Sequence, residues 1–376
     1  METNDGETTR YLYHQQKKPT MEYTNKIKKT IKSLEQISKS QGVDLNEEIN
    51  SLEKKLTKIQ PEKYSEWQEQ KKGHTPWERV KIARTLERPK PQDYIEYLIQ
   101  DFIPLHGDRL GHDDNAILGG IGYLKDIPVT AISTRRGKEL KGNMDANFGM
   151  PHPEGYRKAL RLAKQAEKFK RPVVFFVDTP GAFCGIGAEE RGIAESIARN
   201  LFELSDLNVP TFTVITGEGG SGGALALSVS NKLYMMENAI FSVISPEGAA
   251  SILFKDASKA EQAAESLRLT AYDLFELGIV DEIQKETEDF DTNPQPTMQE
   301  LEKMLYNDIF HFSFMDEEKM KDQRYNKYRS IGFFETDKNQ LPDKILNEVN
   351  KNGGAKTAAE GKTFLKELAR LLGLKQ

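Results

Sequence analysis

The sequence has almost no cysteine and no long apolar run, and both absences restrict what the protein can be. Its single cysteine, Cys184, excludes an intramolecular disulfide and any cysteine-rich zinc site within the 376 residues. One cysteine is typical of a protein from a reducing compartment. Because no run of 18 apolar residues occurs, we expect no membrane span. The first ten residues, METNDGETTR, lack an apolar segment, and we expect neither a secretory signal nor an ordinary transit peptide.

Neither sign of charge is in large excess. The chain has 53 basic and 58 acidic residues, and the net charge of -5 argues against a general nucleic-acid binder. Apolar residues make up 37% of the sequence, and 28 glycines bring the total close to the roughly 45–50% of ordinary globular proteins. The composition therefore predicts a sizeable core that is diluted by polar extensions.

Composition and periodicity divide the chain into five regions. Apolar residues recur at threes and fours in residues 27–37 and 45–59, which is typical of two amphipathic helices joined by a short turn. The five regions are a disordered N-terminus (1–22), a helical region that contains this hairpin (23–92), a main α/β domain (93–283), a linker with C-terminal helices (284–330) and an extension without an assigned role (331–376).

The main domain shows alternating strand and helix patterns. Residues 116–133 predict a β-hairpin, and residues 154–170 predict an amphipathic helix with Pro153 at its first position. A helix pattern over about residues 188–206 follows, and a further pair of strands is predicted within residues 233–245. These elements predict an α/β fold of stacked β-β-α units.

An internal repeat lies within this domain. Residues 171–183 align with residues 208–220 at an offset of about 38, which places Gly181 opposite Gly219. Each copy predicts a strand, a glycine turn and a helix. Strands separated by a helix of this length are expected to be parallel neighbours.

The most informative stretch is Val209–Ser230. Residues 209–216 predict a buried strand, five glycines follow within Gly217–Gly223, and small apolar residues predict a helix over Ala224–Ser230. A strand that breaks into glycine and reforms as a helix leaves several backbone N–H groups without partners, near the positive end of the helix dipole. The stretch therefore predicts a site that holds an anion or a developing oxyanion.

Two other interpretations of this turn are a packing point and a nucleophile elbow. A packing point between strand and helix needs one glycine, and five within seven positions favour a functional site. The pattern Gly219-x-Ser221-x-Gly223 also matches the nucleophile elbow of α/β-hydrolases. That reaction requires a later histidine, and the only one is His311, which lies beyond the main domain.

Other candidate residues have structural alternatives of their own. Thr179–Phe183 forms either a wall of the same cavity or a plain turn. The basic cluster that begins with Arg135 and Arg136 is either a solvated loop or a contact for the phosphates of a nucleotide-like ligand. Cys184 is more typical of a small hydrophobe than of a nucleophile. Because the spacing of His106 and His112 does not match a zinc pattern, we predict no metal site in this chain.

Several long segments resemble one family. The segments that carry the resemblance are GDRLGHDDNAILGGIG, NFGMPHPEGYRKALRLAKQAEKFKRPVV, DTPGAFCGIGAEERG, GEGGSGGALALSVSNKLYM and FSVISPEGAASILFKD. Through them, residues 25–330 are similar to the α subunit of the carboxyltransferase of acetyl-CoA carboxylase, of the bacterial and plastid heteromeric type. The resemblance implies a crotonase-like (ClpP/crotonase) ββα superhelix, with the N-terminal helical hairpin and a C-terminal helical extension added to it.

The resemblance also implies a reaction and a site. The family transfers a carboxyl group from carboxybiotin to acetyl-CoA and forms malonyl-CoA, the first committed step of fatty acid biosynthesis. By position, Gly222 and Gly223 would form the oxyanion hole on the biotin side. The residues then expected to contact substrate are Gly219, Gly220, Gly181, Ala182, Phe183, Arg135 and Arg136.

The resemblance further implies partners. A β subunit would supply a zinc ribbon and the facing hole for the enolate, in an α2β2 heterotetramer that is active only when both subunits are present. Biotin would arrive on a separate biotin carboxyl carrier protein, loaded by an ATP-dependent biotin carboxylase, in the cytoplasm or, for a plastid-encoded member, the stroma. The alternatives are a non-catalytic scaffold and a stand-alone acyl-CoA hydratase or hydrolase, for which Glu218, Glu189 or Glu190 would have to act as the acid.

Overall fold

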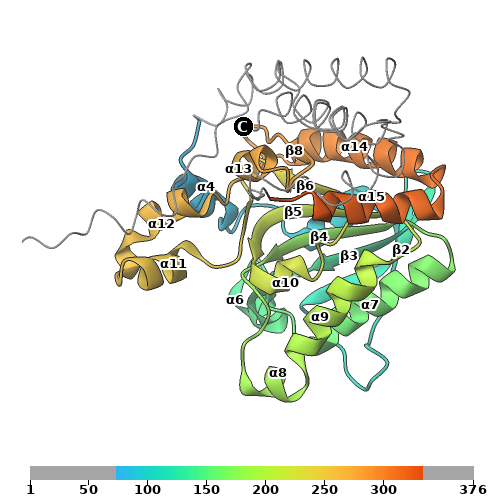
Figure 1. Cartoon of the computed structure of the whole chain (residues 1–376), viewed down its shortest axis with the longest axis horizontal. Helices are drawn as coiled ribbons and strands as arrows, with labels where there is room; N and C mark the ends of the chain where they lie inside the picture. The colour runs from blue at the N-terminus through green and yellow to red at the C-terminus, as the bar shows by residue number, and fades with distance from the viewer. Residues whose placement is uncertain (1–72, 333–376) are drawn as a thin grey trace, which may run out of the picture. The chain divides into compact units, whose positions relative to one another are not determined.

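The structure of the chain is a computed structural model that describes residues 73–332 (Figure 1). These residues belong to one unit, Lys71–Gly332. The predicted N-terminal disorder, the helical hairpin and nearly all of the C-terminal extension lie outside the described residues, and the boundaries at 93 and 283 stay predictions.

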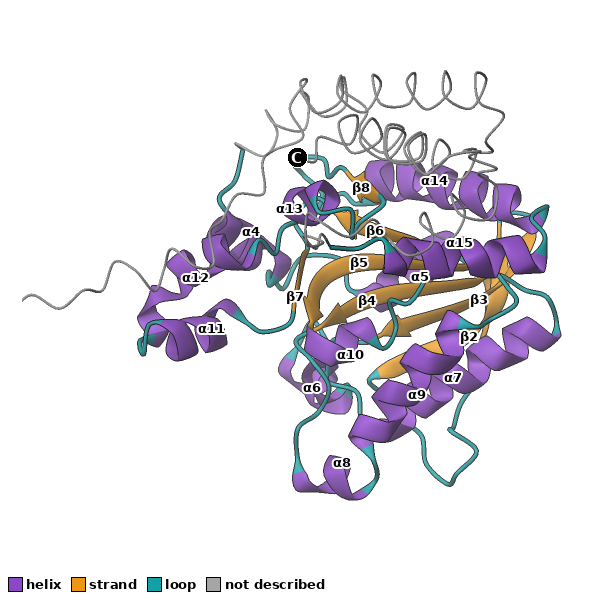
Figure 2. Ribbon diagram, in the orientation of Figure 1, coloured by secondary structure: helices purple, strands orange, loops and turns teal. Residues whose placement is uncertain are grey.

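A mixed sheet of eight strands forms the centre of the described part (Figure 2). The order is β1-β2-β3-β4-β5-β6-β8, and β7 pairs with the end of β5. The first three strands are antiparallel neighbours, and all later pairs are parallel. The strands are β1 Gln100–Pro104, β2 Ile117–Leu124, β3 Ile127–Thr134, β4 Val173–Thr179, β5 Thr211–Gly220, β6 Lys232–Met236, β7 Ile240–Ser242 and β8 Glu282–Gln284.

Helices cover the sheet. Helix α7 packs on β2, β3 and α9, whereas α5 packs on β3 and β4 and also contacts α14. The helices are α4 Pro76–Ala83, α5 Pro91–Leu98, α6 Leu140–Asp145, α7 Pro153–Lys168, α8 Ile186–Glu190, α9 Ile193–Ser205, α10 Ser221–Leu225, α11 Pro246–Leu253, α12 Ala260–Leu267, α13 Ala271–Glu276, α14 Gln295–Ser313 and α15 Glu317–Arg329. Two short 3-10 helices are η1 Asn147–Gly149 and η2 Ala257–Lys259.

Most of the predicted elements are confirmed. Strands β2 and β3 form the hairpin, and α7 begins at Pro153. The start of α11 follows its sequence signal, since the Ser245 hydroxyl caps the helix by accepting from the Gly248 N–H. The α/β prediction holds, and the stacked units give the crotonase-like arrangement that the resemblance implied.

The internal repeat is confirmed for the strands but not for the turns. Strands β4 and β5 pair in parallel from Val173 opposite Thr211 to Val177 opposite Ile215, at the predicted offset of 38. The next pair is Thr179 opposite Gly219, so the two glycines that the repeat aligns, Gly181 and Gly219, are offset by two residues in the sheet. A bulge in β5 absorbs the two extra residues and increases the bend of the strand.

Three other predictions need correction. Strands β6 and β7 are not a pair, because each of them pairs with a different part of β5. The helix over 188–206 is two helices, α8 and α9, which meet at Gly192 in the left-handed conformation (φ 81°). Helix α10 ends at Leu225, not at Ser230.

One arginine fixes the C-terminal helix to the start of β5. Arg324 of α15 is fully buried and donates to the backbone carbonyls of residues 204, 205, 207 and 209 and to Oδ1 of Asn231. Burial lowers the pKa of its guanidinium to about 10. Because it satisfies carbonyls between α9 and β5, α15 stabilises the beginning of the strand whose other end carries the glycine turn.

Candidate functional site

The glycine-rich stretch is a strand for longer than its sequence predicts. Strand β5 continues through Gly220, and residues 218–220 pair with β7. Ser221 then adopts a φ of 51°, and α10 begins at once. This left-handed residue turns the chain sharply from strand to helix, at a cost of roughly 1–2 kcal/mol for a residue with a side chain.

The sharp turn leaves two amides free. Within residues 73–332, the N–H groups of Gly222 and Gly223 have no hydrogen-bond acceptor. Both lie in the first turn of α10, where N–H groups have no partner within the helix and point out of its N-terminal end. Since α10 has only five residues, we assign the anion-binding potential to these two N–H groups and not to a helix dipole.

Packing explains most of the glycines. A Cβ added at Gly217 would lie 2.6 Å from the carboxyl carbon of Asp178, and one at Gly219 would lie 2.7 Å from the Phe241 ring. Gly220 and Gly223 are pressed against the backbone of residues 180–182, with the same kind of contact at 2.2 and 2.4 Å. Real Cβ atoms do not come this close. Packing therefore requires four of the five glycines, and their number alone does not favour a functional site over a packing point.

Gly222 is the exception. A Cβ there would lie 3.7 Å from Ile197 of α9, which is an ordinary contact. A side chain at this position would therefore point toward α9. A double valine substitution at Gly222 and Gly223 would mix an effect on the site with a clash against residues 181–182.

The structure brings the two glycine turns of the repeat together. Gly220 and Gly223 contact Pro180, Gly181 and Ala182, so the predicted wall lies directly beside the predicted hole. Phe183 continues this wall, because its N–H donates to the carbonyl oxygen of residue 151 and its ring packs on His152 at 4.4 Å between centroids.

The two candidate arginines separate. Arg135 is exposed, and it lines a small surface pocket with His106 and Lys158. Arg136 is half-buried and donates from Nη1 to Asp178 Oδ1 at 2.8 Å and to Glu218 Oε2 at 3.2 Å. The negative charges of these two carboxylates raise the pKa of Arg136. Only Arg135 keeps the exposed guanidinium that a phosphate contact needs.

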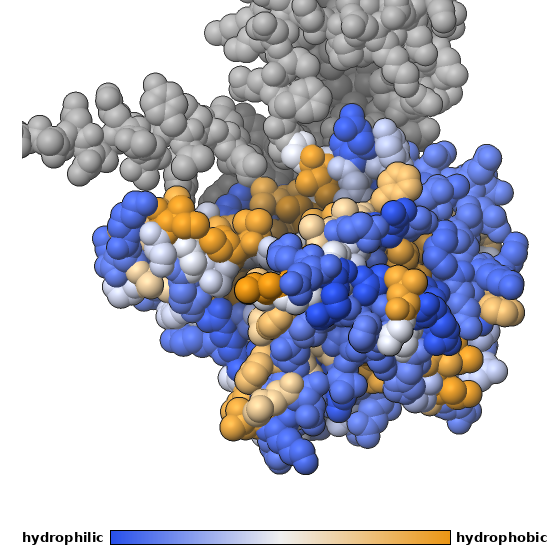
Figure 3. Space-filling view, turned by 90° about the horizontal axis from the view of Figure 1, so that it is seen from below, coloured by the Kyte–Doolittle hydropathy of each residue, from blue (hydrophilic) through white to orange (hydrophobic). Residues whose placement is uncertain are grey.

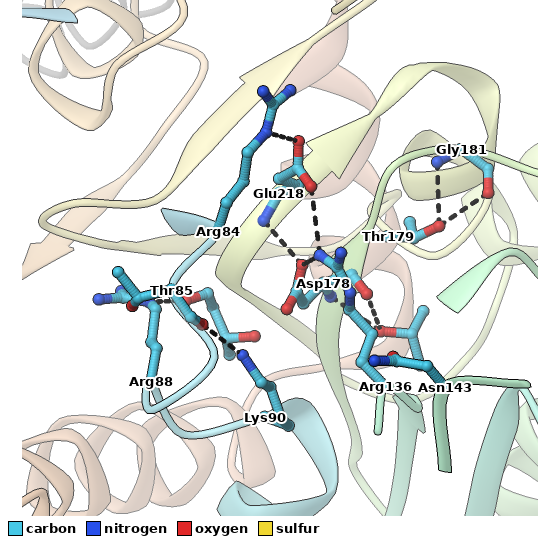
Figure 4. A network of polar contacts seen from close by, with 12 residues as sticks. Arg84, Thr85, Arg88, Lys90, Arg136, Asn143, Asp178, Thr179, Gly181 and Glu218 are labelled. Atoms are coloured by element: carbon cyan, nitrogen blue, oxygen red, sulfur yellow. Dashed lines mark hydrogen bonds and ion pairs between the residues drawn. The ribbon is translucent and has the colours of Figure 1, made fainter. Parts of the chain in front are cut away.

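Arg136 belongs to an ionic network at the ends of β3, β4 and β5 (Figure 4). Asp178 and Glu218 are 2% and 7% exposed, and Arg84 Nε donates to Glu218 Oε1 at 2.8 Å. Arg84 also pairs with Glu247 at 2.6 Å. Sequence reasoning missed this network, although an aspartate at the end of the apolar run VVFFV is an available signal for a buried, paired carboxylate.

No metal centre is evident in the described part of the chain. Within residues 73–332, no three His, Cys, Asp or Glu side chains are grouped in a way that could hold a metal ion. The same residues contain no helix of sufficient length and apolarity to span a bilayer.

A family model for acetyl co-enzyme A carboxylase carboxyltransferase-like proteins matches residues 18–332. The chain belongs to this family. Its relatives include the acetyl-coenzyme A carboxylase carboxyl transferase subunit alpha of Listeria monocytogenes serotype 4a (strain HCC23), which is 50% identical over 322 residues, 85% of this chain and 97% of the relative. The subunit of the same name from Geobacillus thermodenitrificans (strain NG80-2) is 50% identical over 307 residues, 81% and 92% of the two chains.

Solved structures with a similar arrangement were also found. Transcarboxylase 12S has a TM-score of 0.47 and 17% identity, over 68% of this chain and 44% of that one. A Pseudomonas malonate decarboxylase hetero-tetramer in complex with coenzyme A has a TM-score of 0.47 and 16% identity, over 57% of this chain and 87% of that one.

Within this carboxyltransferase family member, the hydrolase interpretation finds no support. Ser221 is exposed at the turn, and no hydrogen bond joins it to a histidine among residues 73–332. His311 lies in α14, where its ring contacts Phe312. The acids needed for a hydratase are no better placed: both Glu218 oxygens face arginines, and Glu189 and Glu190 are exposed on α8.

Proposed function

We propose that this chain is the α subunit of an acetyl-CoA carboxylase carboxyltransferase and that its Ser221–Gly223 turn holds the oxyanion on the biotin side of the reaction. The proposal rests chiefly on one observation. Two neighbouring amides, those of Gly222 and Gly223, have no acceptor among residues 73–332 and begin a helix at a sharply turned strand end.

The amides suit the charge that the reaction develops. Carboxybiotin, carried on a separate protein, supplies the carboxyl group, and negative charge moves onto the ureido oxygen as that group leaves. The Gly222 and Gly223 N–H groups would donate to this oxygen, and fixed donors of this kind contribute about 3 kcal/mol each to the transition state. These donors need no reorganisation, because a hydrogen bond from the Tyr156 hydroxyl to the Gly223 carbonyl oxygen, at 3.2 Å, holds the turn in place.

The remaining candidates surround these donors in different roles. Gly181, Ala182 and Phe183 would form the wall beside the bound group, while Gly219 and Gly220 belong to the paired strand and support the turn. We propose Arg135 as a contact for coenzyme A phosphates, since it is exposed.

The proposal requires a second subunit. A single cysteine cannot supply a zinc ribbon, so a β subunit would provide that ribbon and the hole for the enolate, in an α2β2 assembly. Large apolar side chains that are exposed on the elements near the turn suit such an interface, and the face drawn in Figure 3 carries apolar patches among polar residues. The exposed apolar side chains near the turn are Leu140, Met144, Phe148, Ile186, Leu225 and Val243. We place the complex in the cytoplasm, with the biotin carrier and biotin carboxylase as further partners.

Two substitutions at Gly222 test the oxyanion hole. Gly222→Pro removes the N–H while keeping a helical φ, and Gly222→Ala keeps the N–H. Carboxyl transfer from malonyl-CoA to biocytin is measured with and without a zinc-ribbon β subunit. We expect the proline variant to lose about 100-fold in kcat and the alanine variant to stay within about threefold.

Two results would contradict the proposal. Full activity of the proline variant would show that the Gly222 N–H is not part of the site. Transfer by this chain without a β subunit would contradict the half-site interpretation and favour a stand-alone enzyme. Thermal unfolding of both variants serves as the control for folding.

A further inference from the structure

The bulge in β5 divides the strand from the turn. One residue of β4, Asp178, faces three residues of β5, Thr216 to Glu218, while the pairs on either side are regular. Each extended residue advances a strand by about 3.3 Å. The bulge therefore takes up two residues of chain and places Gly219 beside Thr179. At the offset of 38, Gly219 would have lain beside Gly181.

Each residue of the bulge is held by a group outside the strand ladder. The Thr216 carbonyl accepts from Arg88 Nε at 3.0 Å. Gly217 lies under the Asp178 carboxylate, where a side chain does not fit. The Glu218 N–H donates to Asp178 Oδ1 at 2.9 Å, so this carboxylate replaces the carbonyl that a regular ladder would offer.

Buried charge makes this arrangement specific. The Asp178 carboxylate is compensated by Arg136, which also reaches Glu218. A buried carboxylate without its cation is strongly destabilising, so only one placement of the bulge satisfies these groups together. The segments that supply the cations are remote in sequence: Arg84 and Arg88 precede α5, and Arg136 follows β3 (Figure 4).

The held bulge determines where the free amides lie. Gly220 follows it directly and packs on the Pro180 carbonyl oxygen, and Gly223 packs on Ala182 N. Both contacts depend on the two-residue shift in register. If the bulge relaxed, Ser221 to Gly223 would slide along residues 179–182.

We propose that Asp178, acting with Arg136 and Glu218, is a positioning residue that fixes the β5 bulge and so aims the Gly222 and Gly223 amides at the ureido oxyanion of biotin. The inference rests on the proposed function, because it concerns the amides assigned there. It predicts that loss of the carboxylate affects turnover without affecting binding of the acyl-CoA.

The test compares Asp178→Asn with a variant at a second ion pair, whose two side chains are partly buried. Asp308→Asn is the control: Asp308 of α14 pairs with Lys232 at 2.8 Å, at the beginning of β6 and so at the end of the parallel strands away from the turn. Gly217→Ala is a second variant, whose Cβ would displace the carboxylate while Asp178 itself remains. All three are assayed as complexes with the β subunit, with malonyl-CoA and biocytin.

We expect Asp178→Asn and Gly217→Ala to lower kcat by about 10- to 100-fold, with KM for malonyl-CoA unchanged within about twofold. Hydrogen exchange should speed up by at least about tenfold in peptides covering residues 214–226 and stay unchanged elsewhere. Asp308→Asn should alter neither quantity, even if it lowers the melting temperature by a similar amount.

Two results would overturn the inference. One is wild-type kcat in both test variants; the other is a loss of kcat in Asp308→Asn that matches theirs. Failure of the proposed function looks different, because the wild-type complex would then transfer no carboxyl group. In that case the exchange measurement still decides whether Asp178 fixes the bulge.

Discussion

The two glycine turns of the repeat begin from similar sequences and differ in how firmly they are held. After β4, Gly181 has a φ of 149° and no atom lies within 4 Å of its absent Cβ. The chain then stays partly exposed through Cys184 before α8 begins. After β5, the chain enters α10 directly, with Gly220 and Gly223 packed on backbone.

The difference comes from side chains that lie outside the repeat. Arg88 and Arg84 contact the end of β5, at Thr216 and Glu218. The turn after β4 has a local arrangement, in which Thr179 Oγ1 accepts from the Gly181 N–H at 3.1 Å and donates to its carbonyl at 2.8 Å. The open turn after β4 can therefore serve as a wall of the site, whereas the turn after β5, which aligns two N–H donors, must be supported from several segments.

The largest effect should come from removing the buried arginine of the second turn. Arg88 is 1% exposed, pairs with Glu286 through both Nη atoms at 2.8 and 2.5 Å, and holds Thr216. Arg88→Met would leave the Glu286 carboxylate buried without its cation, at a cost of about 3–5 kcal/mol. Urea unfolding measures this loss. The exposed pair Glu195–Arg199 gives the control, since Arg199→Met should cost less than about 1 kcal/mol, and equal losses would contradict the burial argument.

The next largest effect should distinguish the two turns by the loss of stability when a glycine of each is replaced with alanine. In Gly223→Ala the new Cβ would lie 2.4 Å from Ala182 N and 2.6 Å from the Gly181 carbonyl carbon. Since both are backbone atoms, the free energy of unfolding should fall by about 3 kcal/mol. In Gly181→Ala the Cβ meets nothing and only the left-handed φ is unfavourable, which costs about 1–2 kcal/mol. Urea unfolding of both variants checks the order, and a larger loss at Gly181 would reverse our account of the two turns.

The sequence predicts those features of the two turns that depend on neighbouring residues. The runs VVFFV and TFTVIT predict buried strands because β-branched and aromatic residues fill them, and the repeat predicts their parallel pairing. Pro153 and Ser245 mark the starts of two helices correctly. The strand–glycine–helix order also predicts unpartnered N–H groups at this turn, and the family resemblance assigns them to Gly222 and Gly223.

Sequence does not predict the bulge or the reasons for the glycines. The bulge depends on contacts that only the folded chain creates. Asp178 pairs with Arg136, which follows β3, and Arg84 and Arg88 contact Glu218 and the Thr216 carbonyl. An alignment without gaps therefore placed Gly219 opposite Gly181. The small apolar residues of Ala224–Ser230 predict a longer helix than the structure has, since α10 ends at Leu225 and the buried residues Ala226 and Leu227 lie beyond it.

A smaller effect should appear with pH. Burial alone would raise the pKa of Glu286, but the charge of Arg88 and the hydrogen bonds it receives hold that pKa below its ordinary 4.5. Its contribution to stability is therefore fully present above pH 4.5 and is lost as the pH falls through the lower folded value. Between pH 5.5 and 3, the free energy of unfolding should fall less steeply for Glu286→Gln than for the wild type. Parallel slopes would mean that this pair does not support the second turn.

The smallest effect on stability should come from a substitution that weakens the first turn alone. Thr179→Val keeps the shape of a fully buried side chain and removes both hydrogen bonds to Gly181, for a loss of about 1 kcal/mol. Cys184, the chain's single cysteine, is exposed five residues later and accepts a nitroxide label. Thr211→Val is the control, since that hydroxyl bonds Asn231 at the beginning of β5. Label mobility should rise in Thr179→Val and not in the control, because the hydroxyl of Thr179 makes the hydrogen bonds that close the first turn on itself. Unchanged mobility in both would show that the packing of residues 180–183 on other segments is enough to hold the first turn.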